Sequence, residues 1–458
     1  MSVPPSASPT LDYLAAIHDA HSDPARLEAL YQEARGSGGA SAGASERFRE
    51  ALLASYNEFP GNPLYAAWFY RLQYAPASAV GVRPAAPANW SLAIPISIVL
   101  GLVYFALSDL TWRVARGIPY LALLWAPLAA LAILWFVTLA ARRGYVRATL
   151  LSVGLIALTA YVLAIGQTVS ADAANVYLTL MVLHVPLLAG CAIGLAVLGW
   201  RSSAADRFGF LTKSIEVIAT AGVAAIAGGI FVGLTYGIFS AIGVELNSLV
   251  TRLLVAGGGG LIPVLAVAAV YDPRLAPHAQ EFRRGFARLL AILMRALLPL
   301  TLLVLVVYLA VIPFNFAQPF TNRDVLIVFN VLLFAILALL VGVTPAGPDD
   351  VPVRLAGWLR AGIAALAALV VLVSLYALAA VLYRTFNAHL LTMNRAVVIG
   401  WNVINIAILL ALLVGQSRPG RPGAGWVARA QGAFKLGSTA YLAWALLLAL
   451  ALPWALPA

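Results

Sequence analysis

The chain has 458 residues, of which 62% are hydrophobic and only 10% are charged. Soluble globular chains carry about 25% charged residues, and disordered chains combine low hydrophobicity with high charge, so both classes are excluded. The net charge of +11 does not indicate nucleic-acid binding, because the basic residues lie in short loops between apolar runs. Cys191 is the only cysteine, which excludes an intrachain disulfide and a thiolate metal cluster.

Residues 1–90 are predicted to form a separate, polar, cytosolic helical region. They contain eight acidic residues and six arginines but no long apolar run. A basic stretch followed by an apolar one is missing at the start, so a signal peptide is not expected. Prolines make 76–89 a stiff linker, and the region before it could bind a protein partner.

The spacing of apolar residues predicts three helices in this region. The first ends at the Asp23-Pro24 break, the second covers 25–34, and the third covers 45–56 with Ser45 as its N-cap. An aromatic cluster follows, which indicates a membrane-interface or packing patch, with a peptide or ligand groove as the alternative. Its members are Tyr65, Trp68, Phe69, Tyr70 and Tyr74.

From residue 91 onward, uncharged apolar runs recur that are long enough to cross a bilayer, for which about 20 residues suffice. This pattern predicts an all-α fold, a polytopic transmembrane helix bundle over 91–458. The eleven predicted spans are 91–109, 118–140, 148–169, 176–200, 214–243, 252–271, 289–314, 325–344, 359–383, 396–416 and 436–456.

The basic residues predict the orientation of these spans. When the loops are assigned alternately to two sides, the side that holds the N-terminal region receives 17 Lys and Arg, and the other side receives six. Cytoplasmic loops carry the excess of basic residues in membrane proteins. The N-terminus is therefore expected in the cytoplasm and the C-terminus outside.

The fifth span carries small residues four positions apart, among them Gly229, Gly233 and Gly237. Small residues at this spacing let helix backbones approach closely, so we expect a packing seam within the bundle. A homodimer contact and a sliding surface in a transporter are the alternatives. The run Gly257–Gly260 in the sixth span indicates either packing glycines or an unwound, functional break.

Few ionisable residues lie near the spans. His184 lies in the middle of the fourth span, where it is either a functional group or a neutral imidazole bonded to a neighbouring helix. Glu216, at the start of the fifth span, is expected to be an ordinary boundary charge near the headgroups. Arg284, Arg288 and Arg295 predict an interfacial basic helix that binds anionic lipid at the cytoplasmic face.

The tenth span and the loop before it form the richest polar segment. Arg384 lies in the loop, and the spacing of Arg395, Asn402 and Asn405 puts these three side chains on one helical face. With His184, they are the predicted substrate-binding residues, for an anionic headgroup or a polar solute. The alternative is that the amides bond to neighbouring helices.

Residues 391–395, Leu-Thr-Met-Asn-Arg, precede an apolar span. This stretch resembles the Leu-Thr-x-x-Arg element of bacterial multipass membrane proteins in the domain of unknown function 4153 family. His389-Leu390 stands where that family usually has Tyr-Gly, and the resemblance covers roughly residues 200–416. It implies a bacterial inner-membrane protein but no known reaction, cofactor or catalytic residue.

Three functions of different classes fit these features. The first is a transporter or permease for a small solute or lipid, favoured by the number of spans and the sparse polar groups inside them. The second is a membrane scaffold or sensor whose cytosolic head binds a partner. The third is a transferase for lipid heads or envelope glycans, with Arg384 and Arg395 holding phosphate. The sequence has no recognisable catalytic, metal or cofactor motif, so an enzyme is least favoured.

The predicted orientation can be tested with reporter fusions at Gly423 and Ala458. These positions flank the eleventh span, so the reporters are expected on opposite sides, with Gly423 in the cytoplasm. A paired phosphatase and fluorescent-protein reporter measures the side directly. Two cytoplasmic signals would show that the number of spans is wrong.

Overall fold

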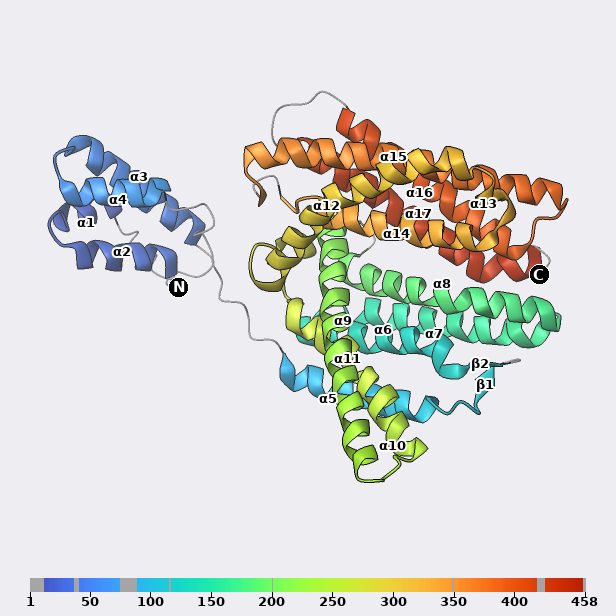
Figure 1. The fold of residues 1–458 in the computed structure, drawn as a ribbon. Helices are drawn as coiled ribbons and strands as arrows, with labels where there is room; N and C mark the ends of the chain where they lie inside the picture. The colour runs from blue at the N-terminus through green and yellow to red at the C-terminus, as the bar shows by residue number, and fades with distance from the viewer. Residues whose placement is uncertain are drawn as a thin grey trace, which may run out of the picture. The chain divides into compact units, whose positions relative to one another are not determined.

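A computed structural model gives the fold of the chain and describes residues 12–36, 41–74, 89–114, 117–199, 201–347, 350–417 and 425–455. The chain divides into two compact units, Met1–Pro87 and Ala88–Ala458 (Figure 1). All long elements are helices, and the only sheet among the described residues pairs β1 (Arg113–Val114) with β2 (Ile118–Pro119).

The N-terminal unit contains four helices around its own apolar core. The side chain of an Asp or Asn residue caps the N-terminus of three of these helices. For example, Asp23 Oδ1 accepts from the backbone N–H groups of Ala25 and Arg26, both at 3.0 Å. The buried side chains include Ile17, Leu27, Phe48, Leu52 and Tyr65. The helices are α1 (Tyr13–Asp19), α2 (Pro24–Gly36), α3 (Ser41–Glu58) and α4 (Pro63–Tyr74).

One expectation about this unit is wrong, and one of two interpretations is selected. Helix α3 begins at Ser41, so the prediction that Ser45 is its N-cap is wrong; alanine and serine continue a helix readily, and one glycine costs only about 1 kcal/mol. The aromatic cluster lies on α4, where Tyr65 and Trp68 are buried in the core of the unit. Packing is therefore the correct interpretation for these two side chains.

The second unit is a bundle of long apolar helices. Among the described residues, eleven helical segments are long and apolar enough to cross a membrane, which confirms the predicted fold class and number of spans. These segments are Trp90–Leu107, Tyr120–Ala141, Tyr145–Ile165, Ala171–Leu198, Ala204–Ala241, Ser248–Val270, Gly285–Asn315, Leu326–Val343, Arg354–Asn387, Met393–Ser417 and Gly425–Ala455.

Most of these segments are single helices. They are α5 (Trp90–Leu107), α6 (Tyr120–Ala141), α7 (Tyr145–Thr168), α8 (Ala171–Leu198), α9 (Ala204–Ala241), α12 (Gly285–Val311), α14 (Arg323–Val343), α15 (Val353–Asn387), α16 (Met393–Ser417) and α17 (Gly425–Ala455). The sixth span joins α10 (Ser248–Arg252), a π-helical turn (Leu253–Gly257) and α11 (Gly258–Val270). Short elements are the 3-10 turns Pro277–Ala279 and Ile312–Asn315, and α13 (Gln318–Thr321).

The helices form two groups. Helices α5 to α8 pack with one another, and α5 and α6 also pack on α11. Helices α12 to α17 form the second group, and α9 contacts members of both groups (Figure 1). Helix α17 joins the groups by packing on α8 and α9. The hydroxyl of Tyr177 on α8 donates to the Ala449 carbonyl of α17 at 2.5 Å, which fixes this contact.

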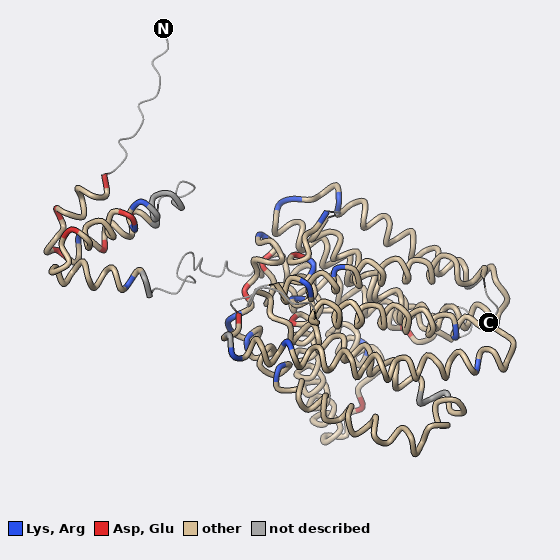
Figure 2. The backbone as a smooth tube through the Cα atoms, turned by 90° about the horizontal axis from the view of Figure 1, so that it is seen from above, with Lys and Arg blue, Asp and Glu red and all other residues tan. Residues whose placement is uncertain are grey.

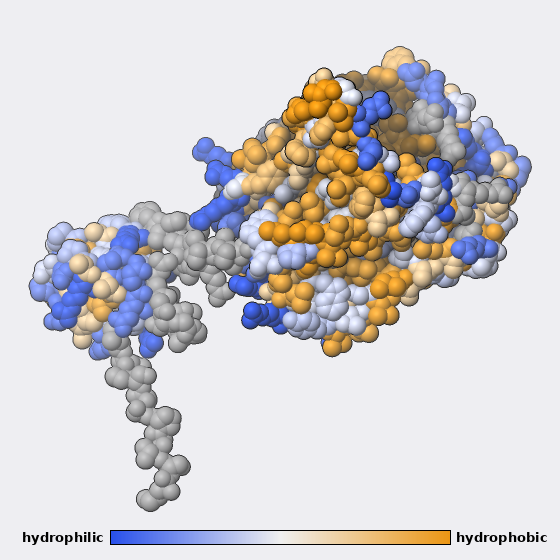
Figure 3. Space-filling view, turned by 90° about the horizontal axis from the view of Figure 1, so that it is seen from below, coloured by the Kyte–Doolittle hydropathy of each residue, from blue (hydrophilic) through white to orange (hydrophobic). Residues whose placement is uncertain are grey.

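Lys and Arg residues of this unit gather at one end of the helices (Figure 2). Loops that are far apart in sequence meet there: Arg143 donates to the Arg274 carbonyl at 3.4 Å, and Arg207 donates to Thr439 at 2.6 Å. We call this end, which holds the starts of α9 and α12 and the end of α14, the arginine-rich end. The face shown in Figure 3 is mostly hydrophobic, as a surface in contact with lipid requires.

Close backbone contact occurs at the glycines of the sixth span. A Cβ atom built on Gly260 would lie 2.7 Å from Gly101 Cα on α5, and one on Gly101 would lie 2.7 Å from the Gly257 carbonyl oxygen. The run Gly257–Gly260 stays helical and includes the end of the π-helical turn. The helix is therefore not unwound here, and packing on α5 explains Gly257 and Gly260, whereas Gly258 and Gly259 face open space.

The seam expected on the fifth span is not formed within the bundle. Gly229, Gly233 and Gly237 lie on the exposed second half of α9, and a Cβ atom on any of them would meet nothing within 4 Å. Although these glycines are four residues apart, no described helix packs against the face that they form. The expectation of a packing seam inside the bundle is therefore wrong for these residues.

Helix α9 does have one tight glycine, Gly209, and it provides a stability test. A Cβ atom there would lie 2.5 Å from the Pro277 carbonyl oxygen, and backbone cannot move aside as a side-chain tip can. We expect Gly209→Ala to lower the free energy of unfolding by about 1–3 kcal/mol, the usual cost of overpacking. Thermal unfolding in detergent measures this change.

Gly233→Ala is the matched control, because it makes the same substitution on the same helix in open space. Both changes gain the same helix propensity, so their difference isolates the clash at Gly209. Equal unfolding temperatures for the two variants would contradict the close contact between α9 and Pro277.

Candidate functional site

His184 is buried on α8 and both of its ring nitrogens are bonded. Nδ1 lies 2.7 Å from the Leu180 carbonyl oxygen, and Nε2 lies 3.0 Å from Trp401 Nε1 on α16. An indole nitrogen only donates, so Nε2 accepts and the proton is on Nδ1. His184 is thus a neutral imidazole that links two helices, and no ring nitrogen is left to bind a substrate.

The two predicted amides also bond to other helices. Asn402 donates to Asn330 Oδ1 on α14 at 3.0 Å and to the Val398 carbonyl at 2.9 Å. Asn405 accepts a hydrogen bond from the hydroxyl of Tyr441 on α17. The amides are three residues apart but face different neighbours. Of the two, only Asn402 lines a void of about 10 Å³, roughly the space of one water molecule.

The two predicted arginines lie apart from these amides. Arg384 is half-buried in the last turn of α15, and Arg395 Nη1 donates to the carbonyl of Leu390 in its own loop at 2.7 Å. Neither lines the void beside Asn402 or a larger cavity at the arginine-rich end. The structure therefore does not bring Arg384, Arg395, Asn402, Asn405 and His184 together around one space.

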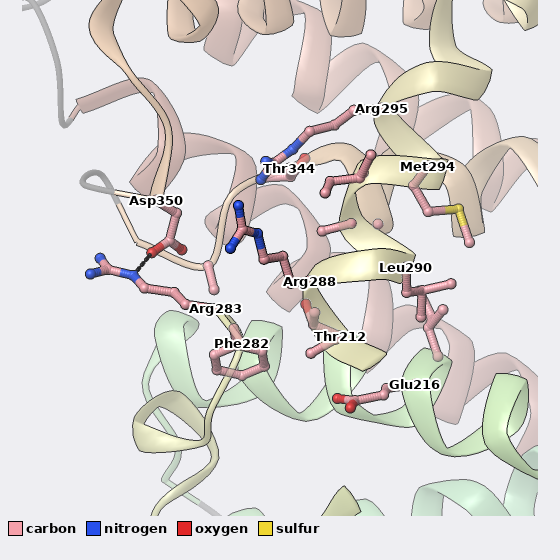
Figure 4. A pocket seen from close by; sticks show the side chains of 16 residues that line it. Thr212, Glu216, Phe282, Arg283, Arg288, Leu290, Met294, Arg295, Thr344 and Asp350 are labelled. Carbon is pink, nitrogen blue, oxygen red and sulfur yellow. Dashed lines mark hydrogen bonds and ion pairs between the residues drawn. The ribbon is translucent and has the colours of Figure 1, made fainter. Parts of the chain in front are cut away.

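A larger cavity lies at the arginine-rich end, between α9, α12 and the end of α14. Its volume is about 370 Å³, within the range of small-molecule sites (Figure 4). Leu290, Ile292 and Met294 contribute apolar wall. The polar lining residues are Thr212, Glu216, Arg283, Arg288, Arg295, Thr344 and Asp350.

Glu216 forms a buried ion pair at one side of this cavity. Lys213 Nζ lies 2.7 Å from Glu216 Oε2, and the two side chains are 5% and 8% exposed. Lys213 also lies 5.2 Å from the centre of the Phe282 ring, which favours the cation. The expectation that Glu216 is an ordinary boundary charge is wrong, because α12 and the segment before it enclose this side chain.

The second carboxylate, Asp350, is also neutralised by a cation. Arg283 Nε donates to Asp350 Oδ1 at 2.7 Å, and the other oxygen accepts from the backbone N–H of Gly347 at 2.5 Å. The side chain of Asp350 is largely buried, whereas that of Arg283 is half exposed. Figure 4 shows this pair at one side of the cavity, beside Arg288.

Arg288 and Arg295 have no such partner. Within the part of the chain that the structure describes, neither side chain has a hydrogen-bond or ion-pair partner, and Arg295 Nε is buried without an acceptor. By contrast, Arg252 at the end of α10 donates to Ser108, Asp109 and the Phe105 carbonyl at 3.0–3.1 Å. Arg288, which is exposed, and Arg295, whose Nε is buried, therefore line one cavity without an ion-pair partner.

The Arg252 cluster lies at the opposite end from the cavity and shows a complete set of partners. Hydrogen bonds from Thr111 and the nearby Arg252 guanidinium hold the pKa of Asp109 below its usual range. Asp109 therefore stays ionised at neutral pH and balances Arg252. Because Arg295 in the cavity lacks such partners, the cavity with Arg288 and Arg295 is the candidate site.

Sequence reasoning missed this cavity as a site. It placed Arg288 and Arg295 on one basic helix face, but Glu216 and Asp350 come from segments more than 50 residues away on either side. A usable signal was the pair Lys213 and Glu216, at helical spacing beside an apolar run, because unneeded charges are removed from such positions.

Compared with models of protein families, with curated proteins and with solved structures, the chain matches none of them. Among the residues that the structure describes, no group of three or more His, Cys, Asp or Glu is placed to hold a metal ion. The function is therefore argued from the cavity alone.

The hydrogen bond between Asn330 and Asn402 allows a test of whether Asn402 links α16 to α14. Contacts of this kind between spans contribute on average about 0.6 kcal/mol and at most about 1.7 kcal/mol. We expect a double-mutant cycle of Asn330→Ala and Asn402→Ala to give a coupling energy in that range, measured by unfolding in detergent. Additive effects would show that the two amides do not interact.

Proposed function

We propose that the protein is a permease-like membrane transporter whose substrate is a lipid or another amphiphile. The supporting observation is the cavity between α9, α12 and the end of α14, which has charged groups on one part of its wall and apolar groups on another. A polar head and an apolar tail need such a divided wall. A site for a fully polar solute would not need Leu290, Ile292 and Met294 beside it.

The exposure of the flanking helices supports entry from the bilayer. Over the most apolar 18 residues of the spans Ala204–Ala241 and Gly285–Asn315, 0% and 11% of the residues are buried. In the other described spans, 28–50% of these residues are buried. Helices α9 and α12 thus offer more surface to lipid than any other described span. A lipid that moves along this surface meets the cavity where the two helices converge.

The expected orientation puts the cavity on the cytoplasmic side. The arginine-rich end would be cytoplasmic by the excess of basic residues in the loops there. The resemblance to the domain of unknown function 4153 family remains a prediction, and with it a bacterial inner membrane. Under this proposal, the substrate is taken from the cytoplasmic leaflet.

One observation favours a second function, that of a membrane scaffold or sensor. The N-terminal unit has its own core, and Arg71 joins its helices by pairing with Glu28 at 2.5 Å and lying 4.2 Å from the centre of the Trp68 ring. Such a unit can bind a partner independently of the membrane unit. This alternative is favoured if deletion of residues 1–87 abolishes the protein's role in the cell but leaves lipid transport unchanged.

Lipid transport can be measured in phosphatidylcholine vesicles that contain the purified protein and a trace of fluorescent phospholipid. Added dithionite bleaches only the fluorescent phospholipid in the outer leaflet. If the protein moves lipid between the leaflets, the bleached fraction exceeds the outer-leaflet share. We expect faster exchange with the protein, and a loss of about tenfold in rate for Arg288→Gln, because a charge-assisted contact contributes about 1.5–3 kcal/mol.

Arg354→Gln is the matched control, since Arg354 is an exposed arginine at the start of α15, also at the arginine-rich end, and does not line the cavity. It is expected to leave the rate unchanged. Bleaching that stops at the outer-leaflet fraction in vesicles shown to contain folded protein would contradict the proposed transport.

A further inference from the structure

We infer that the cavity binds a phosphate group, with Arg288 and Arg295 as its ligands, and that the phosphate belongs to the head of an anionic lipid. This inference rests on the proposed function, because it names the class of amphiphile that the cavity takes. It depends on the balance of charge in the cavity, the depth of Arg295 and the donor geometry of arginine.

The charge balance leaves two positive charges to be compensated. Glu216 is paired with Lys213 at 2.7 Å, and Asp350 is paired with Arg283 at 2.7 Å, so both carboxylates of the lining are already neutralised. Neither Arg288 nor Arg295 forms an ion pair among the described residues, and Asp350, the acidic group that interacts with Arg295 electrostatically, is already paired with Arg283. A cationic or neutral occupant would leave this charge in place, whereas an anion compensates it.

The depth of Arg295 makes compensation more important. Arg288 and Arg295 are seven residues apart, on one face of α12 and about 10.5 Å apart along its axis. The deeper residue therefore lies two turns into an apolar helix, and its Nε is buried without an acceptor. An unpaired charge there is costly, so it indicates a functional group whose partner comes from outside the chain.

The side chains of Arg288 and Arg295 extend from α12 toward the same side of the cavity (Figure 4). Each guanidinium carries several N–H donors in a planar fork, which matches the oxygen atoms of phosphate. Two such forks supply more donors than one carboxylate can accept through its two oxygens. A phosphate, with more oxygen atoms, fits the pair better.

The rest of the cavity fits the glycerol and upper acyl chains of a lipid. Leu290, Ile292 and Met294 line it from α12, and Ile215 lines it from α9. A volume of about 370 Å³ holds a headgroup but not the long acyl chains, which would extend along the exposed apolar faces of α9 and α12. Soluble phosphate esters would use only the charged part of this wall.

The test measures binding in a neutral detergent, by thermal unfolding of the full chain with added lipid. We expect dioleoyl phosphatidic acid and dioleoyl phosphatidylglycerol to raise the unfolding temperature, and dioleoyl phosphatidylcholine to have little effect. Glycerol 1-phosphate and inorganic phosphate form the soluble arm. Stabilisation by these soluble anions as strong as that by the lipids would support the phosphate site but overturn its assignment to a lipid.

Variants separate this site from general attraction to a basic surface. Arg288→Gln and Arg295→Gln are each expected to raise the half-maximal phosphatidic acid concentration about tenfold, and Arg354→Gln to leave it unchanged. Arg288→Lys keeps the charge but loses the planar fork, so it should bind with intermediate strength. An equal effect of all three Gln variants would overturn the inference.

The binding result can be read separately from the transport result. Stabilisation by phosphatidic acid that Arg288→Gln abolishes, without lipid exchange in vesicles, would support the phosphate site and contradict transport. Exchange of fluorescent lipid without any response to phosphatidic acid or to soluble phosphate would overturn the phosphate site and leave transport standing.

Discussion

The cost of placing charge in hydrocarbon is the constraint on which the membrane unit depends. An arginine, lysine or aspartate at the centre of a span costs about 2.5–3.5 kcal/mol on insertion scales. The basic side chains accordingly gather at the arginine-rich end, where backbone carbonyls at the ends of helices accept from them. These contacts connect loops that are distant in sequence, so the same constraint that sets the topology also fixes the ends of the helices.

Inside the bundle, some buried polar side chains bond to other helices. His184 and Trp401 join α8 to α16 and so link the two groups of helices, whereas Asn330 and Asn402 join α14 to α16 within one group. The cavity beside α12 departs from this pattern. Its carboxylates are paired, whereas Arg288 and Arg295 lack an ion-pair partner, as is expected of a site that binds an anion.

Regular periodicity made most of the fold predictable. All eleven spans were found because an apolar run of the right length has few alternatives in a bilayer. Their bounds differ from the structure by up to 11 residues, about three turns, most at the charged starts of α9 and α17. Glycine spacing was less informative. Gly257 and Gly260 contact α5 and Gly233 contacts nothing, although both sets have small residues on an apolar helix. Spacing shows that a face can pack, and not whether a partner is there.

The sequence by itself determined the membrane class, the number of spans and the separation of a polar N-terminal region, because these follow from local composition. Only the tertiary structure decided which polar residues share a space. It separated Arg395, Asn402 and Asn405, which one helix face had grouped, and it brought Glu216, Arg288 and Asp350 from three segments to one cavity. Helix packing sets these distances, and no local pattern encodes how distant helices pack.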